Sequence, residues 1–179
     1  MMQARSAIAK IHRVLLLLPI LLATQARADA YTDVEQLLAT QQFADALTKT
    51  EVYLASKPAD PQMRFLKGVI ETRLQRLDAA QVTFTRLTED YPELPEPYNN
   101  LAVLLAGQGR LEPARAALEM AIRVKPDYVT AQENLGDIYL RLAEQSYGHA
   151  QAADPDNSAL ARKRTLTRGL LTSTLKNTP

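Results

Sequence analysis

Few side chains in this 179-residue chain have the type and spacing that catalysis or metal binding requires. The sequence contains no cysteine, and of its two histidines only His149 lies beyond the first 28 residues. A site built from several imidazoles or thiolates is therefore excluded there, and no thiol is available as a nucleophile. Glu89, Asp90 and Glu93 lie close together, but beside a helix end and a proline they are expected to be solvated charge rather than a glycosidase-type acid pair. We accordingly expect no enzymatic activity, no cofactor and no metal.

The elements that would position any site follow a period of 34 residues. Proline recurs at Pro58, Pro92 and Pro126, each 34 residues from the next. A fixed period in this range is typical of stacked helical repeats. The sequence therefore predicts an array of similar helix pairs rather than a single compact core.

Residues 95–128 contain the clearest of these units. Apolar residues at helical spacing predict a first helix, Gly107 and Gly109 then break it, and Pro126 ends a second helix. The apolar positions are Tyr98, Leu101, Leu104 and Leu105 in the first helix, and Leu111, Ala114, Leu118, Ala121 and Ile122 in the second. Ala102 and Ala114 are small where two antiparallel helices would cross. They allow the two backbones to approach closely.

The unit resembles a tetratricopeptide repeat. The family pattern places an aromatic residue fourth, Leu and a small residue seventh and eighth, alanines twentieth and twenty-seventh, and proline thirty-second. Residues 95–128 match it with Tyr98, Leu101, Ala102, Ala114, Ala121 and Pro126, and depart from it at Leu105, where the family usually has Tyr. The resemblance implies an all-α fold, a right-handed superhelical array of helix-turn-helix repeats with a C-terminal capping helix.

Four units and a cap are expected along the chain, at about residues 29–60, 61–94, 95–128 and 129–156, with a capping helix and basic tail at 157–179. Asp60-Pro61 is a predicted helix start, with Asp60 as the N-cap. The fourth unit is five residues short, so its two helices either fuse into one or cross at a different angle, and the sequence leaves both open. Asp156 or Ser158 is expected to cap the last helix, which is predicted to run through Leu171.

Residues 1–28 have the pattern of a secretory signal peptide. A basic leader precedes a short apolar segment, and Ala26-Arg27-Ala28 supplies the small-x-small pattern for cleavage before Asp29. The ten apolar residues of Val14–Ala23 are too few to cross about 30 Å of hydrocarbon. We expect an exported, periplasmic protein; a leader retained as a membrane tether is the alternative.

Charge is distributed unevenly along the remaining 151 residues. They hold 17 Lys and Arg against 20 Asp and Glu, and all 20 acids lie before residue 157, whereas the last 23 residues carry five bases and no acid. An acidic, exported domain is not expected to bind nucleic acid. The basic C-terminal helix is expected to be a solvated capping face, with weak contact to a membrane or another anionic surface, such as lipid or glycan, as the alternative.

The resemblance also implies a binding groove, because the first helices of such repeats line a concave surface. Positions two, five, nine, twelve and thirteen of each repeat face this groove in the family, and the asparagine at position six often binds ligand backbone. The groove residues expected here are Phe65, Val69, Arg73, Asn99, Asn100, Val103, Glu133, Asn134, Asp137 and Arg141. The lysines of the carboxylate-clamp subclass are missing from position five. A protein or peptide partner is expected, without recognition of a terminal carboxylate.

Together these patterns predict a non-catalytic interaction adaptor or scaffold of the bacterial cell envelope. An accessory or hydrolytic factor in cell-wall metabolism and a membrane-tethered scaffold are the alternatives.

Overall fold

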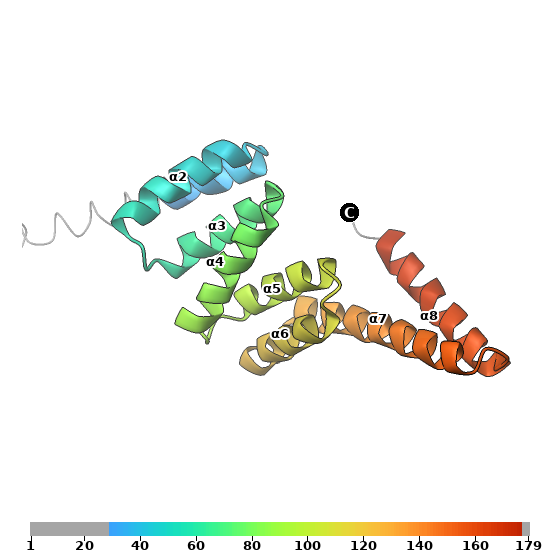
Figure 1. The fold of residues 1–179 in the computed structure, drawn as a ribbon. Helices are drawn as coiled ribbons and strands as arrows, with labels where there is room; N and C mark the ends of the chain where they lie inside the picture. Colours follow the sequence, from blue (N-terminus) through green and yellow to red (C-terminus); the bar gives the residue numbers. More distant parts are fainter. Residues whose placement is uncertain (1–28, 177–179) are drawn as a thin grey trace, which may run out of the picture. The chain divides into compact units, whose positions relative to one another are not determined.

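The computed structural model describes residues 29–176, and this part of the chain is all-helical, without a strand. A first helix spans residues 29–39. It is followed by α2 (Phe43–Ser56), α3 (Pro61–Arg73), α4 (Leu77–Asp90), α5 (Pro95–Gly107), α6 (Leu111–Val124), α7 (Val129–Ala153) and α8 (Ser158–Lys176) (Figure 1). The chain divides into two compact units after Arg76, here called unit 1 and unit 2. The predicted signal peptide lies outside the described residues.

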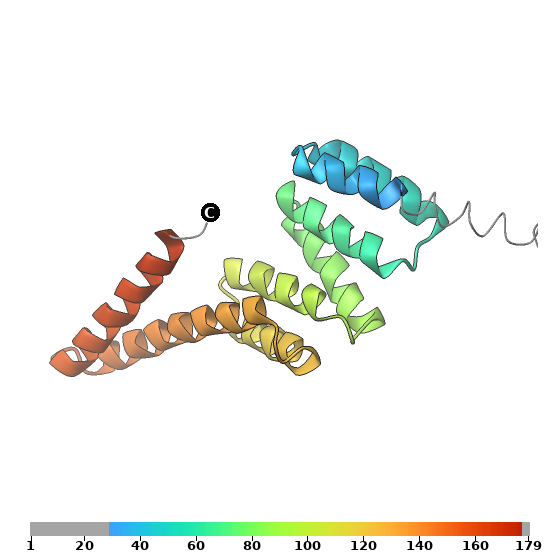
Figure 2. The same cartoon turned by 180° about the vertical axis from the view of Figure 1, so that it is seen from behind.

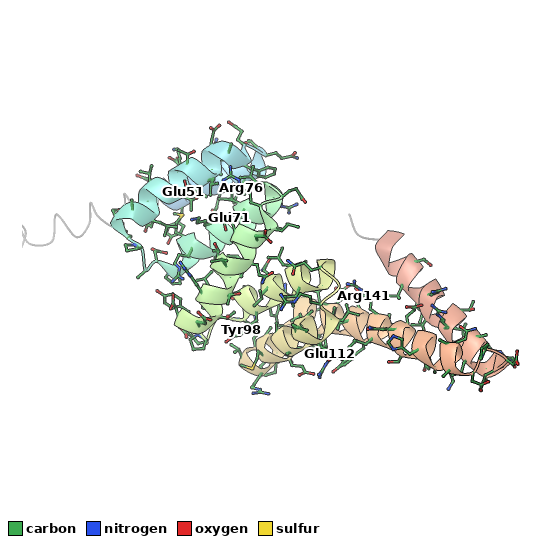
Figure 3. The ribbon with its side chains drawn as sticks, in the orientation of Figure 1. Glu51, Glu71, Arg76, Tyr98, Glu112 and Arg141 are labelled. Carbon is green, nitrogen blue, oxygen red and sulfur yellow. The ribbon has the colours of Figure 1, made fainter. Side chains whose placement is uncertain are left out.

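Unit 1 consists of the first helix, α2 and α3. The first helix lies beside α2 (Figure 2), and the two share a core with α3. That core is formed by Val34, Ala46, Leu47, Met63 and Ile70. On its surface, Lys67 of α3 lies 3.8 Å from Glu51 of α2 and 3.7 Å from Glu71 of α3, two carboxylates labelled in Figure 3.

Asp60 joins the three helices of unit 1. Its carboxylate accepts a hydrogen bond from the backbone N–H of Met63 at 3.1 Å, which confirms the predicted N-cap of α3. The Tyr53 hydroxyl of α2 donates to the same carboxylate at 3.0 Å, and the Tyr31 hydroxyl of the first helix also donates to it. The rings of Tyr31 and Tyr53 are 5.7 Å apart. One buried acid therefore receives donors from every helix of the unit.

Unit 2 is built around the crossing of α5 and α6. Ala102 and Ala114 are both buried there, at 1% and 0% exposure, as the close crossing requires. Leu105, Leu118, Ala121 and Ile138 complete this core, so α7 packs on the same helix pair. Tyr98 is labelled in Figure 3, and its hydroxyl donates to the backbone carbonyl of Thr88 in α4 at 3.2 Å.

In the shortened fourth repeat, the two expected helices are fused into one. Residues 129–153 form a single continuous helix, α7, of 25 residues. The following helix, α8, packs back on its C-terminal half, where Arg164 and Arg168 both donate to Glu144, at 3.0 and 2.7 Å. These two hydrogen bonds lower the pKa of Glu144. They fasten α8 to α7.

The last helix differs from expectation at both ends. Its N-terminal cap is Asn157, whose Oδ1 accepts from the backbone N–H of Leu160 at 3.2 Å, rather than Asp156 or Ser158. Asparagine is as good a cap as aspartate or serine, so residue type alone does not decide the position. The helix also continues past Leu171 to Lys176, because no glycine or proline occurs between these two residues.

In three of the repeats, the turn between the two helices of the repeat has the same backbone motif. Gln41, Gln75 and Gly109 have φ angles of 58°, 59° and 76°, and these left-handed residues lie 34 positions apart. The residue after each donates its N–H five residues back, from Gln42 to Leu37, Arg76 to Glu71 and Arg110 to Leu105. This is the Schellman pattern of helix termination. The equivalent fourth position is Ala143, which lies inside α7.

The turn motif makes a testable prediction at Gly109. A Cβ added there would meet no heavy atom within 4 Å, so Gly109→Ala is opposed only by the left-handed backbone, at a cost of about 1 kcal/mol in stability. Gly107, two residues earlier, ends α5 with equally open surroundings, so Gly107→Ala is expected to stabilise by about 0.5 kcal/mol. Urea denaturation checks the pair. Shifts of the same sign would contradict the proposed origin of the effect.

Candidate functional site

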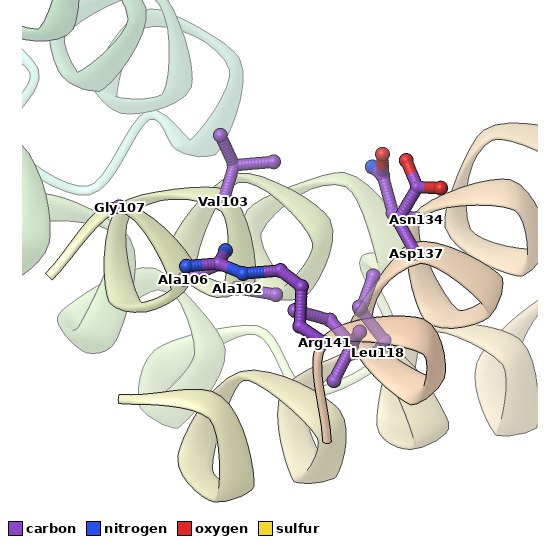
Figure 4. Close-up of a pocket in the computed structure, with 9 residues that line it drawn as sticks. Ala102, Val103, Ala106, Gly107, Leu118, Asn134, Asp137 and Arg141 are labelled. Atoms are coloured by element: carbon purple, nitrogen blue, oxygen red, sulfur yellow. The ribbon is translucent and has the colours of Figure 1, made fainter. Parts of the chain in front are cut away.

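The main candidate site is a hollow of about 210 Å³ between α5 and α7 in unit 2, here called the α5–α7 hollow (Figure 4). Its floor is apolar, formed by Ala102 and Ala106 of α5, Leu118 of α6 and Ile138 of α7. Val103, on the first of these helices, is 51% exposed at its edge. A valine so exposed on a folded helix is available for contact with another molecule.

Three polar side chains of α7 border this apolar floor. Asn134 and Asp137 project to the same side as Val103, and Arg141 reaches back over Ala102 and Ala106 (Figure 4). They follow one another at helical spacing, which places all three on one face of α7. The site therefore offers an amide, a carboxylate and a guanidinium within one small concave surface.

Asn134 also links α7 to α5 through a hydrogen bond. Its Nδ2 donates to Oδ1 of Asn99 at 2.8 Å, and Asn99 is only 7% exposed. Asn100, the equivalent of Asn134 in the preceding repeat, instead donates to the backbone carbonyl of Glu96 at 2.9 Å. The two asparagines thus make different contacts within the chain.

Unit 1 has a hollow of its own, of about 750 Å³, here called the α3 hollow. It is lined by Leu38 and Phe43 near the turn between the first helix and α2, and by Val69 and Arg73 on α3. The two left-handed turn residues, Gln41 and Gln75, also line it. Arg73 is exposed, while Val69 is half-buried.

The predicted groove residues divide by their position in the repeat. Those at positions nine and thirteen line a hollow: Val69 and Arg73 in unit 1, and Val103, Asp137 and Arg141 in unit 2. Asn134, at position six, joins the second group. Phe65, Asn99 and Glu133, at position five, and Asn100 line neither hollow; Asn99 is buried and Glu133 is exposed.

Several lining residues were not predicted. Ala106, Leu118 and Ile138 carry the ordinary apolar pattern of repeat cores, so their types do not show that they also reach a hollow. Leu38 and Phe43 were not predicted, because no groove residue was assigned to the first repeat. Gln41 and Gln75 precede the turn glycine Gly109 at intervals of 34 residues, and this period was the available signal for the two turn residues.

The carboxylates considered for acid–base chemistry line neither hollow. Glu89, Asp90 and Glu93 are all exposed, at the end of α4 and in the turn that follows. This exposure agrees with their interpretation as solvated charge. The arrangement in the hollows is suited to binding through apolar contact and hydrogen bonds.

The repeat pattern also matches a known family model. The model described as "Tetratricopeptide repeat" matches residues 34–95 and 99–163, well over half of the chain. The chain belongs to the tetratricopeptide repeat family. The matched segments contain both hollows, so these tetratricopeptide repeats supply the residues of the candidate site.

Individual relatives agree with this assignment at the level of the fold. The chloroplastic tetratricopeptide repeat domain-containing protein PYG7 of Arabidopsis thaliana is 35% identical over 80 residues, which are 42% of this chain and 27% of that protein. The tetratricopeptide chain thus spans about a quarter of that relative's length.

Two solved structures share the tetratricopeptide fold at low sequence identity. The first repeat domain of Spaghetti (RPAP3), bound to the HSP90 peptide SRMEEVD, has a TM-score of 0.60 at 15% identity, over 64% of this chain and 90% of that one. The type III secretion chaperone SycD of Yersinia enterocolitica, in complex with a peptide of the translocator YopD, has a TM-score of 0.60 at 14% identity, over 65% and 95%.

Proposed function

We propose that this protein is a non-catalytic adaptor that binds a segment of a partner polypeptide in the α5–α7 hollow. The supporting observation is the combination found there: a half-exposed Val103 over an alanine floor, with Asn134, Asp137 and Arg141 at the rim. Apolar contact combined with a few polar groups is what peptide-recognition sites use.

The size of the hollow favours a peptide over a small metabolite. Sites for drug-sized ligands occupy roughly 300–1,000 Å³, whereas the α5–α7 hollow has about 210 Å³. That volume suits one or two side chains of a longer segment. The opposite charges of Asp137 and Arg141 suit a segment that offers both donors and acceptors, as a peptide backbone does.

The similar structures support the same class of partner. The RPAP3 domain and SycD are both seen in complex with a peptide. In this chain Phe65, Asn99 and Glu133 stand where the carboxylate-clamp subclass has lysine, so the proposed partner segment is internal rather than a C-terminus.

A peptide-display experiment tests the proposal. Peptides selected from a random display library on the full chain should lose affinity about tenfold or more when Val103→Asp and Arg141→Ala are introduced, because the pair removes both the exposed apolar contact and the guanidinium of the site. Val129→Asp and Arg123→Ala are the matched control pair: Val129 is 72% exposed on α7, Arg123 is exposed on α6, and neither lines a hollow. Peptides that tolerate the first pair but not the second would contradict the site.

The proposed place of action is the bacterial periplasm. The basic leader, the short apolar segment and Ala26-Arg27-Ala28 support export with cleavage before Asp29. Mass spectrometry of protein isolated from its native cells should find Asp29 as the first residue. An intact leader, starting at Met1 or Met2, would contradict cleavage and favour the tethered scaffold.

A further inference from the structure

The α8 helix carries two leucines that are more than half exposed. Leu166 is 64% exposed and Leu170, one helical turn later, is 54% exposed. Gly169 lies between them and is also exposed. These residues, together with Arg162 and Lys163, are called the α8 outer face.

Another side of α8 packs against α7. Thr167 is 7% exposed, Leu160 and Leu171 are half-buried, and Arg164 donates to Glu144 and Gln151 of α7 at 3.0 and 3.3 Å. At 100° per residue, Leu166 and Leu170 lie about 100° and about 60° around the helix from Thr167, on the other side of it from Leu171 and Arg164. Both leucines stay more than half exposed beside the packed side.

The charge around these leucines is entirely positive on α8. No acid follows Asp156 in the sequence, whereas Arg162, Lys163, Arg164, Arg168 and Lys176 are all basic. Arg164 and Arg168 bind Glu144, but Arg162 and Lys163 are exposed and flank the leucines on either side. Lys163 lies 5.7 Å from the Tyr147 ring, a contact that leaves its charge intact.

We propose that the α8 outer face docks on an anionic lipid bilayer. Exposed leucines flanked by lysine and arginine are what an interfacial helix presents: the apolar side chains enter the headgroup and acyl boundary while the cations meet lipid phosphates. An anionic glycan would match the cations but would provide no apolar layer for Leu166 and Leu170. No helix among residues 29–176 is long and apolar enough to cross a bilayer, so the contact is one of surface docking.

The absence of cysteine allows a local test in the full chain. A single cysteine at Gly169, where a Cβ meets nothing within 4 Å, can carry an environment-sensitive fluorophore on the α8 outer face. Its emission should shift to shorter wavelength with phosphatidylglycerol vesicles and not with phosphatidylcholine vesicles. The same label at Val129→Cys, on an exposed valine of α7, should not respond. Because the label reports its own surroundings, membrane contact by residues 1–28 does not imitate the result.

Substitutions in the labelled chain separate the apolar contribution of the leucines from the electrostatic contribution of the cations. Leu166→Ser with Leu170→Ser should abolish the shift, and Arg162→Gln with Lys163→Gln should raise the lipid concentration for half-maximal signal on the order of 30-fold. The matched pair Arg110→Gln and Arg123→Gln, exposed cations outside α8, should leave it unchanged.

Three results would overturn the proposal. They are no shift at position 169 with anionic vesicles, an equal shift at position 129, and a shift that appears without vesicles and grows with protein concentration. The last would identify a second copy of the chain as the occupant of this face.

Discussion

Replacing Asp60 with alanine is expected to lower the free energy of unfolding of unit 1 by about 2–4 kcal/mol. The change removes the N-cap of α3, which contributes about 1 kcal/mol. It also removes the acceptor for the Tyr31 and Tyr53 hydroxyls, and hydrogen bonds to a charged group contribute about 1.5–3 kcal/mol. Because Asp60 is only 9% exposed, water replaces these contacts poorly.

Urea denaturation with amide hydrogen exchange measures this effect and locates it. Protection should fall in the first helix, α2 and α3. Asp33→Ala is the matched control, since Asp33 also binds a side chain of another helix, the ammonium of Lys49, but on a half-exposed surface, and such ion pairs contribute within about 1 kcal/mol. Equal losses for the two variants would show that Asp60 is no more than a surface acid.

Replacing Ala114 with phenylalanine is expected to destabilise unit 2 by about 3 kcal/mol or more. Ala114 is fully buried against α5, where Ala102 is also small. Overfilling a packed core typically costs about 1–3 kcal/mol for added methylenes, and a phenyl ring exceeds that change. The two backbones would have to separate to admit it.

Glu112→Phe, two residues earlier on α6, provides the comparison. The Glu112 side chain, labelled in Figure 3, is 64% exposed and accepts a hydrogen bond from Arg115 of its own helix at 2.9 Å. A surface change of this kind is expected to alter stability within about 0.5 kcal/mol. Equal denaturation midpoints for the two variants would mean that Ala114 is not the crossing residue.

The helix pairs could be predicted because each determinant is local. The 34-residue proline period, the small crossing residues Ala102 and Ala114, and the Asp60-Pro61 start all act within a few residues of the structure they specify. The Tyr31 contact with Asp60 is different, since 29 residues separate the two side chains. No periodic pattern predicts it.

The candidate site could be predicted only in part, because some of its side chains are placed by contacts between residues far apart in the sequence. Position nine and thirteen side chains point into the hollows because they lie on the exposed stripe of a first helix. Asn99, also expected in the groove, is buried because Asn134 of the next repeat donates to it, a contact 35 residues away. Whether the fourth unit would turn or fuse was equally undecidable, since residues 129–153 have a helical pattern throughout.

The fused helix α7 has a mechanical consequence. It rises 1.5 Å per residue, so its 25 residues form one rod of about 38 Å. Asn134, Asp137 and Arg141 lie on its first half, and Glu144, which holds Arg164 and Arg168 of α8, lies on its second. With a turn between them, these two regions could move separately. Without one, a tilt of about 5° at the hollow displaces the far end, about 22 Å away, by about 2 Å, so the rod acts as a lever arm that carries α8 with it.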